Sequence, residues 1–131
     1  MAVAMLLSIF SVTAFAKNAS DTSFEFVFKP FLSPTLYTSA RAKEDNSSAY
    51  MKVKSMPAYA INASVVRSDY SEFSKTWVYR FDSSDVNKGR YLANYAYEDD
   101  GYHVKVRIKA IKAVSPAAGF VVSGVWSPDS I

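Results

Sequence analysis

The 131-residue sequence has no cysteine and a single histidine, His103. The absence of cysteine excludes disulfides, Cys–His catalysis and thiolate-bound zinc, and a zinc site would have at most one histidine ligand. His103 also falls on the polar side of an alternating segment beside two basic residues, and no G-x-S-x-G elbow accompanies it. We therefore expect no catalytic residue of the nucleophile–histidine type.

The chain has only a small excess of charge of one sign. It carries 15 basic and 12 acidic side chains, a formal net charge of +3. This permits contact with an anionic polymer without requiring it, and we expect no nucleic-acid partner. Half of the residues are hydrophobic and 15% are aromatic, which is enough for one domain with its own core.

No charged side chain precedes Lys17, and residues 1–16 have a short apolar centre followed by the small-x-small pattern of Ala14 and Ala16. This pattern predicts a helical secretory signal that is cleaved after Ala16. The alternative is a buried N-terminal helix or strand of the fold. The segment is shorter than the roughly 20 residues of a membrane span, and no later apolar run reaches that length. We expect a secreted protein with no stable membrane span after cleavage, and the lack of cysteine favours a Gram-positive source.

The remaining chain shows the period-two alternation of strands and no convincing helix. A flexible segment is expected over 17–23 and one β domain over 24–131. The predicted strands cover residues 24–29, 50–55, 59–67, 75–82, 90–98, 103–110 and 120–126. A helix is an alternative for 90–98, and the Asp-Gly sequence at 100–101 predicts a hairpin turn. About seven antiparallel strands indicate an all-β sandwich, with a small barrel as the alternative.

Basic side chains on two predicted strands are the main binding candidates. Lys105, Arg107 and Lys109 project from one side of the first strand, and Lys52 and Lys54 from one side of the second. If both strands share a sheet face, they form a cationic surface that also carries Tyr50, a candidate aromatic anchor, and Tyr91 or Tyr95. Such a surface suits an anionic cell-wall polymer such as teichoic acid, or an acidic protein partner. The alternative is an ordinary solvated sheet face on which lysine opposes aggregation.

Acidic residues gather in two predicted turns, with Asp82 and Asp85 in one and Glu98, Asp99 and Asp100 in the other. If the turns were neighbours, they could bind calcium or supply paired carboxylates for glycoside hydrolysis. Acidic residues are also common in turns for backbone reasons, and the spacing matches no EF-hand. We therefore predict no metal site and no cofactor.

The chain ends in Gly124-Val125-Trp126-Ser127-Pro128-Asp129-Ser130. With the block from Arg41 to Tyr50 and the segment from Asn94 to Glu98, this ending resembles small exported proteins of Firmicutes whose domain has no assigned function. The resemblance implies a secreted bacterial protein, encoded near export or bacteriocin-type genes, with no known active site to carry over. Trp126 is interpreted as a core residue, with a surface binding anchor as the alternative.

These observations favour a secreted, non-enzymatic β domain that acts at the cell envelope or extracellularly through its surface. The first alternative is a component of a secreted bacteriocin or toxin system, either effector or immunity-like. The second is a carbohydrate-binding or hydrolytic protein that uses the acidic turns. The sequence does not determine the oligomeric state.

Overall fold

The computed structural model describes residues 18–114 and 117–130, which form nine strands and two short helical turns. The strands are β1 (Thr22–Phe28), β2 (Thr35–Tyr37), β3 (Arg41–Ala42), β4 (Ala49–Ser55), β5 (Ile61–Arg67), β6 (Tyr79–Phe81), β7 (Gly89–Leu92), β8 (Lys105–Lys112) and β9 (Phe120–Ser127). The 3-10 helix η1 covers Ser83–Asp85 and the α-helix α1 covers Ala96–Asp100.

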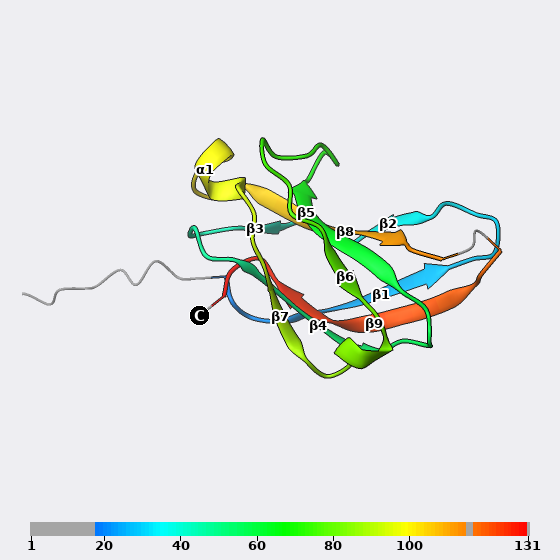
Figure 1. Ribbon diagram of the computed structural model, residues 1–131. Coiled ribbons are helices and arrows are strands. Elements are labelled where there is room, and N and C mark those ends of the chain that lie inside the picture. Colours follow the sequence, from blue (N-terminus) through cyan, green and yellow to red (C-terminus); the bar gives the residue numbers. More distant parts are fainter. Residues whose placement is uncertain (1–17, 115–116, 131) are drawn as a thin grey trace, which may run out of the picture.

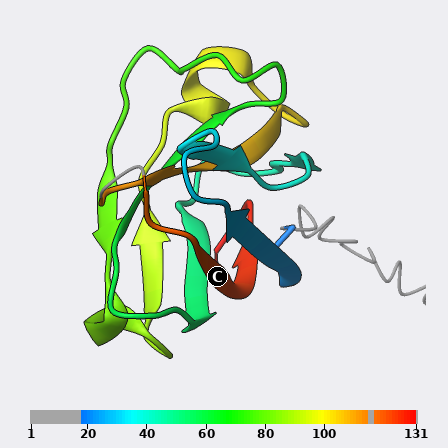
Figure 2. The ribbon, with the colours of Figure 1, turned by 90° about the vertical axis from the view of Figure 1, so that its right-hand side faces the viewer.

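The strands form two antiparallel sheets that pack face to face (Figure 1 and Figure 2). One sheet, which we call sheet A, has the order β1-β9-β4-β7. The other, sheet B, has the order β2-β8-β5-β6, and β3 also pairs with β8. The predicted all-β sandwich is therefore confirmed, and the described residues form no closed barrel.

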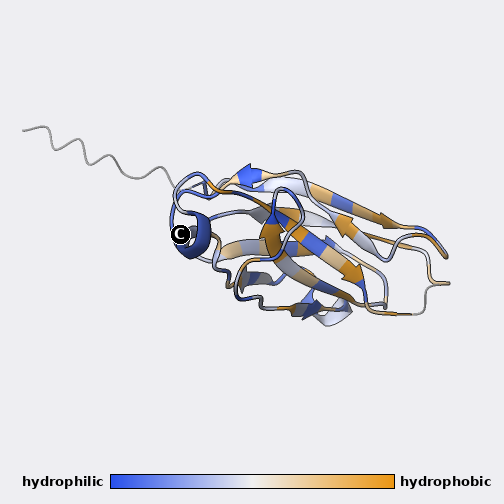
Figure 3. Ribbon diagram, turned by 90° about the horizontal axis from the view of Figure 1, so that it is seen from above, coloured by the Kyte–Doolittle hydropathy of each residue, from blue (hydrophilic) through white to orange (hydrophobic). Residues whose placement is uncertain are grey.

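The core lies between the two sheets and follows from the alternation of apolar side chains. In β1 the rings of Phe24, Phe26 and Phe28 are buried while the residues between them are exposed. In β8 the buried residues Val106 and Ile108 alternate with the basic residues of the same strand. Figure 3 shows this as hydrophobic and hydrophilic bands along the strands. Burial of one side of each strand is the main source of stability here.

The two ends of the sandwich carry different loops because neighbouring strands run antiparallel. The β1–β2, β4–β5 and β8–β9 loops lie at one end, on the right of Figure 1, and we call it the loop end. The β3–β4 loop, α1 and the last described residues lie at the other end.

The predicted hairpin around the Asp-Gly sequence is wrong. The strand expected over 90–98 stops at Leu92, and the alternative of a helix over the same residues is also wrong for most of them, because α1 begins only at Ala96. Asn94 ends the strand locally, since its side chain donates to Leu92 O (3.1 Å) and accepts from Ala96 N (3.2 Å). Gly101 then leaves the helix with φ +81°. The strands on either side also join different sheets, because β7 pairs with β4 and β8 with β5.

Two other expectations differ from the structure in detail, and a third is not tested by it. The strand expected over 75–82 is limited to β6, so Phe81 is buried while Trp77 stays half-exposed against Tyr95. The segment expected to be flexible over 17–23 already includes the start of β1 at Thr22. The export signal over 1–16, with Ala14 and Ala16, lies outside the described residues. Among the residues that are described, no helix is long and apolar enough to cross a membrane.

Candidate functional site

The basic residues of β8 lie on the outer face of sheet B, as the alternation predicts, but two of the three are held by the protein itself. Arg107 donates to Ser68 O and Thr38 O, both at 2.9 Å, and its guanidinium lies 4.9 Å from the ring centroid of Tyr70. Lys109 Nζ lies 3.7 Å from a carboxylate oxygen of Glu72. Lys105 is exposed. Arg107 and Lys109 therefore stabilise neighbouring loops. Glu72 offsets the charge of Lys109, whereas the partners of Arg107 are uncharged and leave its positive charge in place.

Lys52 and Lys54 do not join this group. They lie on β4, which belongs to sheet A, and alternate with the buried residues Met51 and Val53. The outer faces of the two sheets point in opposite directions in a sandwich. The condition for one cationic surface, that both strands share a face, is not met.

The acidic turns are also apart. Asp82 caps η1 by accepting from Ser84 N, while Asp85 accepts from Asp82 N in return. Asp99 binds Ser74 through its backbone N–H and hydroxyl, both at 2.7 Å, and these hydrogen bonds lower its pKa. Figure 1 and Figure 2 both show η1 and α1 far from each other. Within 18–114 and 117–130, no three acidic or histidine side chains are grouped to hold a metal.

A hollow of about 300 Å³ opens on the outer face of sheet A, at the end opposite the loop end. We call it the tyrosine hollow. Its lining residues are Ala19, Asp21, Tyr50, Tyr91, Ser127, Asp129 and Ser130. Three of them form a row across the strands, because Tyr50 pairs with Ser127 of β9 on one side and with Tyr91 of β7 on the other. Sheet register alone thus brings together residues that are far apart in the sequence.

The two tyrosines present ring surface to the hollow. Their ring centroids lie 5.7 Å apart at 56°, and Tyr91 is 60% exposed. The ring of Tyr50 lies across Gly89, where a Cβ would come within 2.6 Å of it. Burial, followed by the negative charge of Asp21 and the neighbouring Tyr91, raises the pKa of Tyr50. Tyr50 therefore stays a neutral hydroxyl that donates and accepts hydrogen bonds at any physiological pH.

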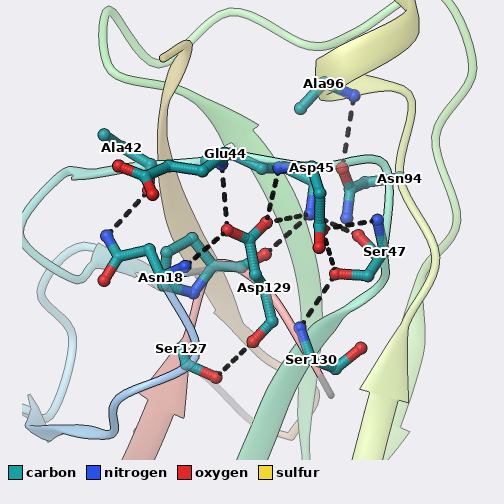
Figure 4. A network of polar contacts seen from close by, with 12 residues as sticks. Asn18, Ala42, Glu44, Asp45, Ser47, Asn94, Ala96, Ser127, Asp129 and Ser130 are labelled. Atoms are coloured by element: carbon teal, nitrogen blue, oxygen red, sulfur yellow. Dashed lines mark hydrogen bonds and ion pairs between the residues drawn. The ribbon is translucent and has the colours of Figure 1, made fainter. Parts of the chain in front are cut away.

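Asp129, which lines the hollow, forms a buried ion pair and lies at the centre of a network of hydrogen bonds (Figure 4). Lys43 Nζ lies 2.9 Å from Asp129 Oδ1, and both side chains are fully buried. The ammonium also donates to Pro128 O at 2.8 Å and to Ser47 O. The second carboxylate oxygen of Asp129 accepts the backbone N–H groups of Asn18 and Glu44, both at 2.9 Å. Because the partners of this ion pair are mostly backbone groups, the chain around Asp129 is held in one position.

Further hydrogen bonds connect the ends of the described chain to this pair. Ser130 N donates to Ser47 Oγ (2.9 Å), and Ser127 Oγ donates to Asp129 O (2.7 Å). Asp45 accepts from the hydroxyl and the backbone N–H of Ser47. Burial opposes the ionisation of Asp45, but these hydrogen bonds outweigh it and the pKa of Asp45 is lowered. The β3–β4 loop and the C-terminal segment thus form a single polar network.

The family of proteins of unknown function DUF2712 matches residues 12–130, nearly the whole chain. The chain belongs to this family. No curated protein and no solved structure matches the DUF2712 chain. Membership agrees with the resemblance to a domain family without an assigned function, and supplies no active site.

Two of the three segments that carried the resemblance meet in this DUF2712 domain. Lys43 and Ser47 come from the block between Arg41 and Tyr50, and Asp129 comes from the C-terminal ending. Arg41 joins the same region, since it donates to Trp126 O (3.1 Å) and its guanidinium lies 5.6 Å from the Trp126 ring centroid. Trp126 itself is fully buried, which agrees with its interpretation as a core residue and leaves no ring surface for a ligand.

Sequence reasoning did not identify the partnership of Lys43 and Asp129 in the DUF2712 domain. The two residues are 86 positions apart, and each lies in a polar segment that is typical of an exposed loop. The available signal was the pair of short motifs that carried the resemblance, because both contain a residue of this ion pair. Tyr50 was identified as a candidate anchor, with Tyr91 or Tyr95 on the same surface, and the structure pairs it with Tyr91. Asp21 was not identified.

Proposed function

We propose that this protein is an exported, non-catalytic binding domain that acts at the bacterial cell envelope and holds a neutral saccharide unit in the tyrosine hollow. The single observation that carries the proposal is the row of Asp21, Ser127, Tyr50 and Tyr91 over the outer face of sheet A. The export signal pattern at 1–16 supports action outside the cytoplasm.

The chemistry of the tyrosine hollow suits a sugar ring. The apolar C–H face of a pyranose packs against aromatic side chains, and its hydroxyls need acceptors and donors at the edge. Tyr91 offers exposed ring surface, and Asp21 offers a carboxylate that accepts hydrogen bonds from hydroxyl groups. Tyr50 adds a hydroxyl group that both donates and accepts, whereas the hydroxyl of Ser127 is buried and already donates to Asp129 O. The hollow, at about 300 Å³, is at the lower end of ligand-site sizes, which fits a small unit of a longer glycan.

The same geometry favours binding over hydrolysis. Glycoside hydrolysis uses two carboxyl groups that flank the scissile bond, one of which must donate a proton. Asp129 is buried and its carboxylate is occupied by Lys43 and two backbone N–H groups, so it cannot serve as either group. Among the described lining residues this leaves Asp21 as the one available carboxylate.

If the ligand binds in the tyrosine hollow, its affinity should depend only weakly on salt concentration. Surface charges attract a polymer through forces that are screened within about 10 Å at 0.1 M salt. Stacking and hydrogen bonds to a neutral sugar are not screened in this way. Because β8 belongs to sheet B and none of its residues lines the tyrosine hollow, we expect the basic residues of β8 to contribute little to binding there.

The test is co-sedimentation of the full chain with purified bacterial cell wall, with and without its anionic polymers removed, at low and high salt. Y50A and Y91A should each weaken binding about tenfold or more, as expected for central aromatic contacts. G89A should also weaken it, because the added Cβ displaces the Tyr50 ring. Y102A is the matched control, since Tyr102 is 51% exposed and lies outside the hollow.

Two results would overturn the proposal. One is the absence of binding of the wild-type protein at every salt concentration. The other is binding that is equal in Y50A, Y91A and Y102A. Binding that is lost at high salt or after removal of anionic polymers would favour electrostatic attachment instead.

A further inference from the structure

The loop end of the sandwich exposes apolar side chains that the proposed function does not use. Ten large hydrophobic residues are exposed in the described chain, and five of them lie at this end. They are Val27, Phe31, Leu32, Tyr59 and Val121. Four of the other five are tyrosines, which carry a polar hydroxyl. The loop end is therefore the more apolar end of the molecule.

Phe31 stands at the tip in a conformation that costs energy. The β1–β2 loop turns through Lys29-Pro30-Phe31-Leu32, and Leu32 N donates to Lys29 O (3.3 Å). Phe31 has φ +59°, a left-handed position in which a type II turn normally has glycine. A bulky residue is unfavourable there. Phe31 is nevertheless 78% exposed and Leu32 59% exposed, so contacts within the fold do not explain the choice of residue.

The tip is mounted firmly on the sandwich. Pro30 packs so closely on the β8–β9 connection that a Cβ on Gly119 would come within 2.7 Å of the proline ring. Lys112 Nζ donates to Lys29 O (3.3 Å) and Ala118 O (2.7 Å), which ties both loops together. The strained turn is thus presented as a rigid projection, and its ordering cost has already been met by the fold.

The three loops of this end contain no carboxylate, although Asp82 of the β6–β7 connection lies close to Tyr59 of the β4–β5 loop. The segments 26–43, 46–68 and 101–128, which contain the β1–β2, β4–β5 and β8–β9 hairpins or loops, have no Asp or Glu at all. Three of the twelve acidic residues are Glu25 in β1 and Asp82 and Asp85 in the β6–β7 connection. The other nine lie in the segments of the opposite end. Lys29 is exposed directly beside the apolar tip. The combination of a projecting apolar pair and an adjacent cation is complementary to an anionic lipid surface.

The exposed area argues for a membrane over a protein partner. A stable protein–protein interface buries about 1,200–2,000 Å² in total. A phenylalanine contributes roughly 150–250 Å² and a leucine is smaller, so the projecting pair is far too small for such an interface. A bilayer accepts two apolar side chains without a shaped groove, because partitioning scales with the apolar area that leaves water.

We propose that Phe31 and Leu32 insert into the interface of an anionic lipid bilayer, with Lys29 on the headgroups. The tyrosine hollow, at the opposite end, then faces away from the membrane. The proposal is independent of what the hollow binds.

The first test places a tryptophan at the tip. The full chain with F31W is mixed with phosphatidylglycerol–phosphatidylcholine vesicles whose acyl chains are brominated, which quench a tryptophan that enters the bilayer. The matched variant is V78W, since Val78 is also highly exposed, at 63%, but lies in the β5–β6 connection. We expect vesicles to cause a blue shift and quenching of the introduced indole in F31W and neither change in V78W.

The blue shift and quenching report only on the introduced indole, so attachment of the protein to vesicles through another segment does not produce them in F31W. Equal quenching of the introduced indole in both variants, or none in F31W, would refute the proposal. A blue shift of F31W fluorescence without vesicles would also refute it, because that shift indicates self-association.

The second test separates partitioning from folding. F31G removes the ring and relieves the left-handed strain, so Tm should stay unchanged or rise while the vesicle partition coefficient falls about tenfold. K29Q should lower partitioning about fivefold on vesicles that contain phosphatidylglycerol and leave it unchanged on phosphatidylcholine alone. A fall in Tm of F31G without a change in partitioning would instead assign Phe31 a purely structural role.

Discussion

Removing the charge of Asp129 should destabilise the fold strongly. In D129N the side chain keeps its size, but the buried ammonium of Lys43 loses its counter-ion at 2.9 Å, and the backbone N–H groups of Asn18 and Glu44 lose a charged acceptor. Breaking one partner of a buried ion pair costs about 3–5 kcal/mol. A domain of this size has a total stability of about 5–15 kcal/mol, so D129N should unfold at much lower denaturant concentration.

The assay is urea unfolding followed by the fluorescence of buried Trp126, together with thermal unfolding. At about 3–6 °C per kcal/mol, Tm should fall by about 10–30 °C. K43M should also be destabilising, but the double variant K43M/D129N should lose less than the sum of the two single losses, because the interaction is lost once only.

A matched surface pair provides the control. Arg67 Nε lies 2.6 Å from Asp100 Oδ2, a shorter contact than that of the buried pair, but both side chains are partly exposed. Exposed pairs contribute little, so D100N should unfold nearly as the wild type does. If D129N and D100N unfolded alike, or if the single losses of K43M and D129N were simply additive, the reasoning from burial would be refuted.

Three further outcomes follow from local contacts. The pKa of Asp45 is lowered in the folded state, so its contribution to stability is present above the unfolded Asp pKa near 4 and is lost as the pH falls through the lower folded pKa. The urea midpoint should therefore drop on acidification below about pH 4. The drop should be less steep in S47A, which lacks the hydroxyl that donates to Asp45. G124A should destabilise strongly in thermal unfolding, since its Cβ would meet a backbone oxygen, Lys52 O, at 2.0 Å. W126A should cost about 3–5 kcal/mol in urea unfolding and W126F clearly less, because the Nε1 of Trp126 has no hydrogen-bond partner among the described atoms.

The sequence predicts the strands best where apolar and polar residues alternate over many positions. The segments around Met51 and Val53, and around Val106 and Ile108, show their buried faces in the predicted register. Prediction failed around Asn94, where a side-chain hydrogen bond to the neighbouring backbone ends β7 and starts α1. Such local competition between side chain and backbone does not change the hydrophobic pattern, so periodicity does not detect it.

The candidate sites were less predictable than the strands. The basic residues of β8 and β4 alternate as expected, but alternation does not tell which sheet a strand joins. Tyr50 was a reasonable candidate from its type, whereas its neighbours in the tyrosine hollow depend on the pairing of β4 with β7 and β9. The strained turn at Phe31 was not predicted, because the sequence shows there only the apolar residues Phe31 and Leu32 between two prolines.

The sequence by itself determined the fold class, the inward-facing residues of the long strands, the absence of disulfides and the small charge excess. These properties depend on composition and on a period-two pattern that each strand carries alone. Only the tertiary structure decided that Lys43 meets Asp129, that Lys52 and Lys105 lie on opposite faces, and that Asp21 lies beside Tyr50 and Tyr91. The physical reason is that strand pairing is non-local: its partners are selected by the packing of the whole core, and the surface residues follow wherever the buried residues place them.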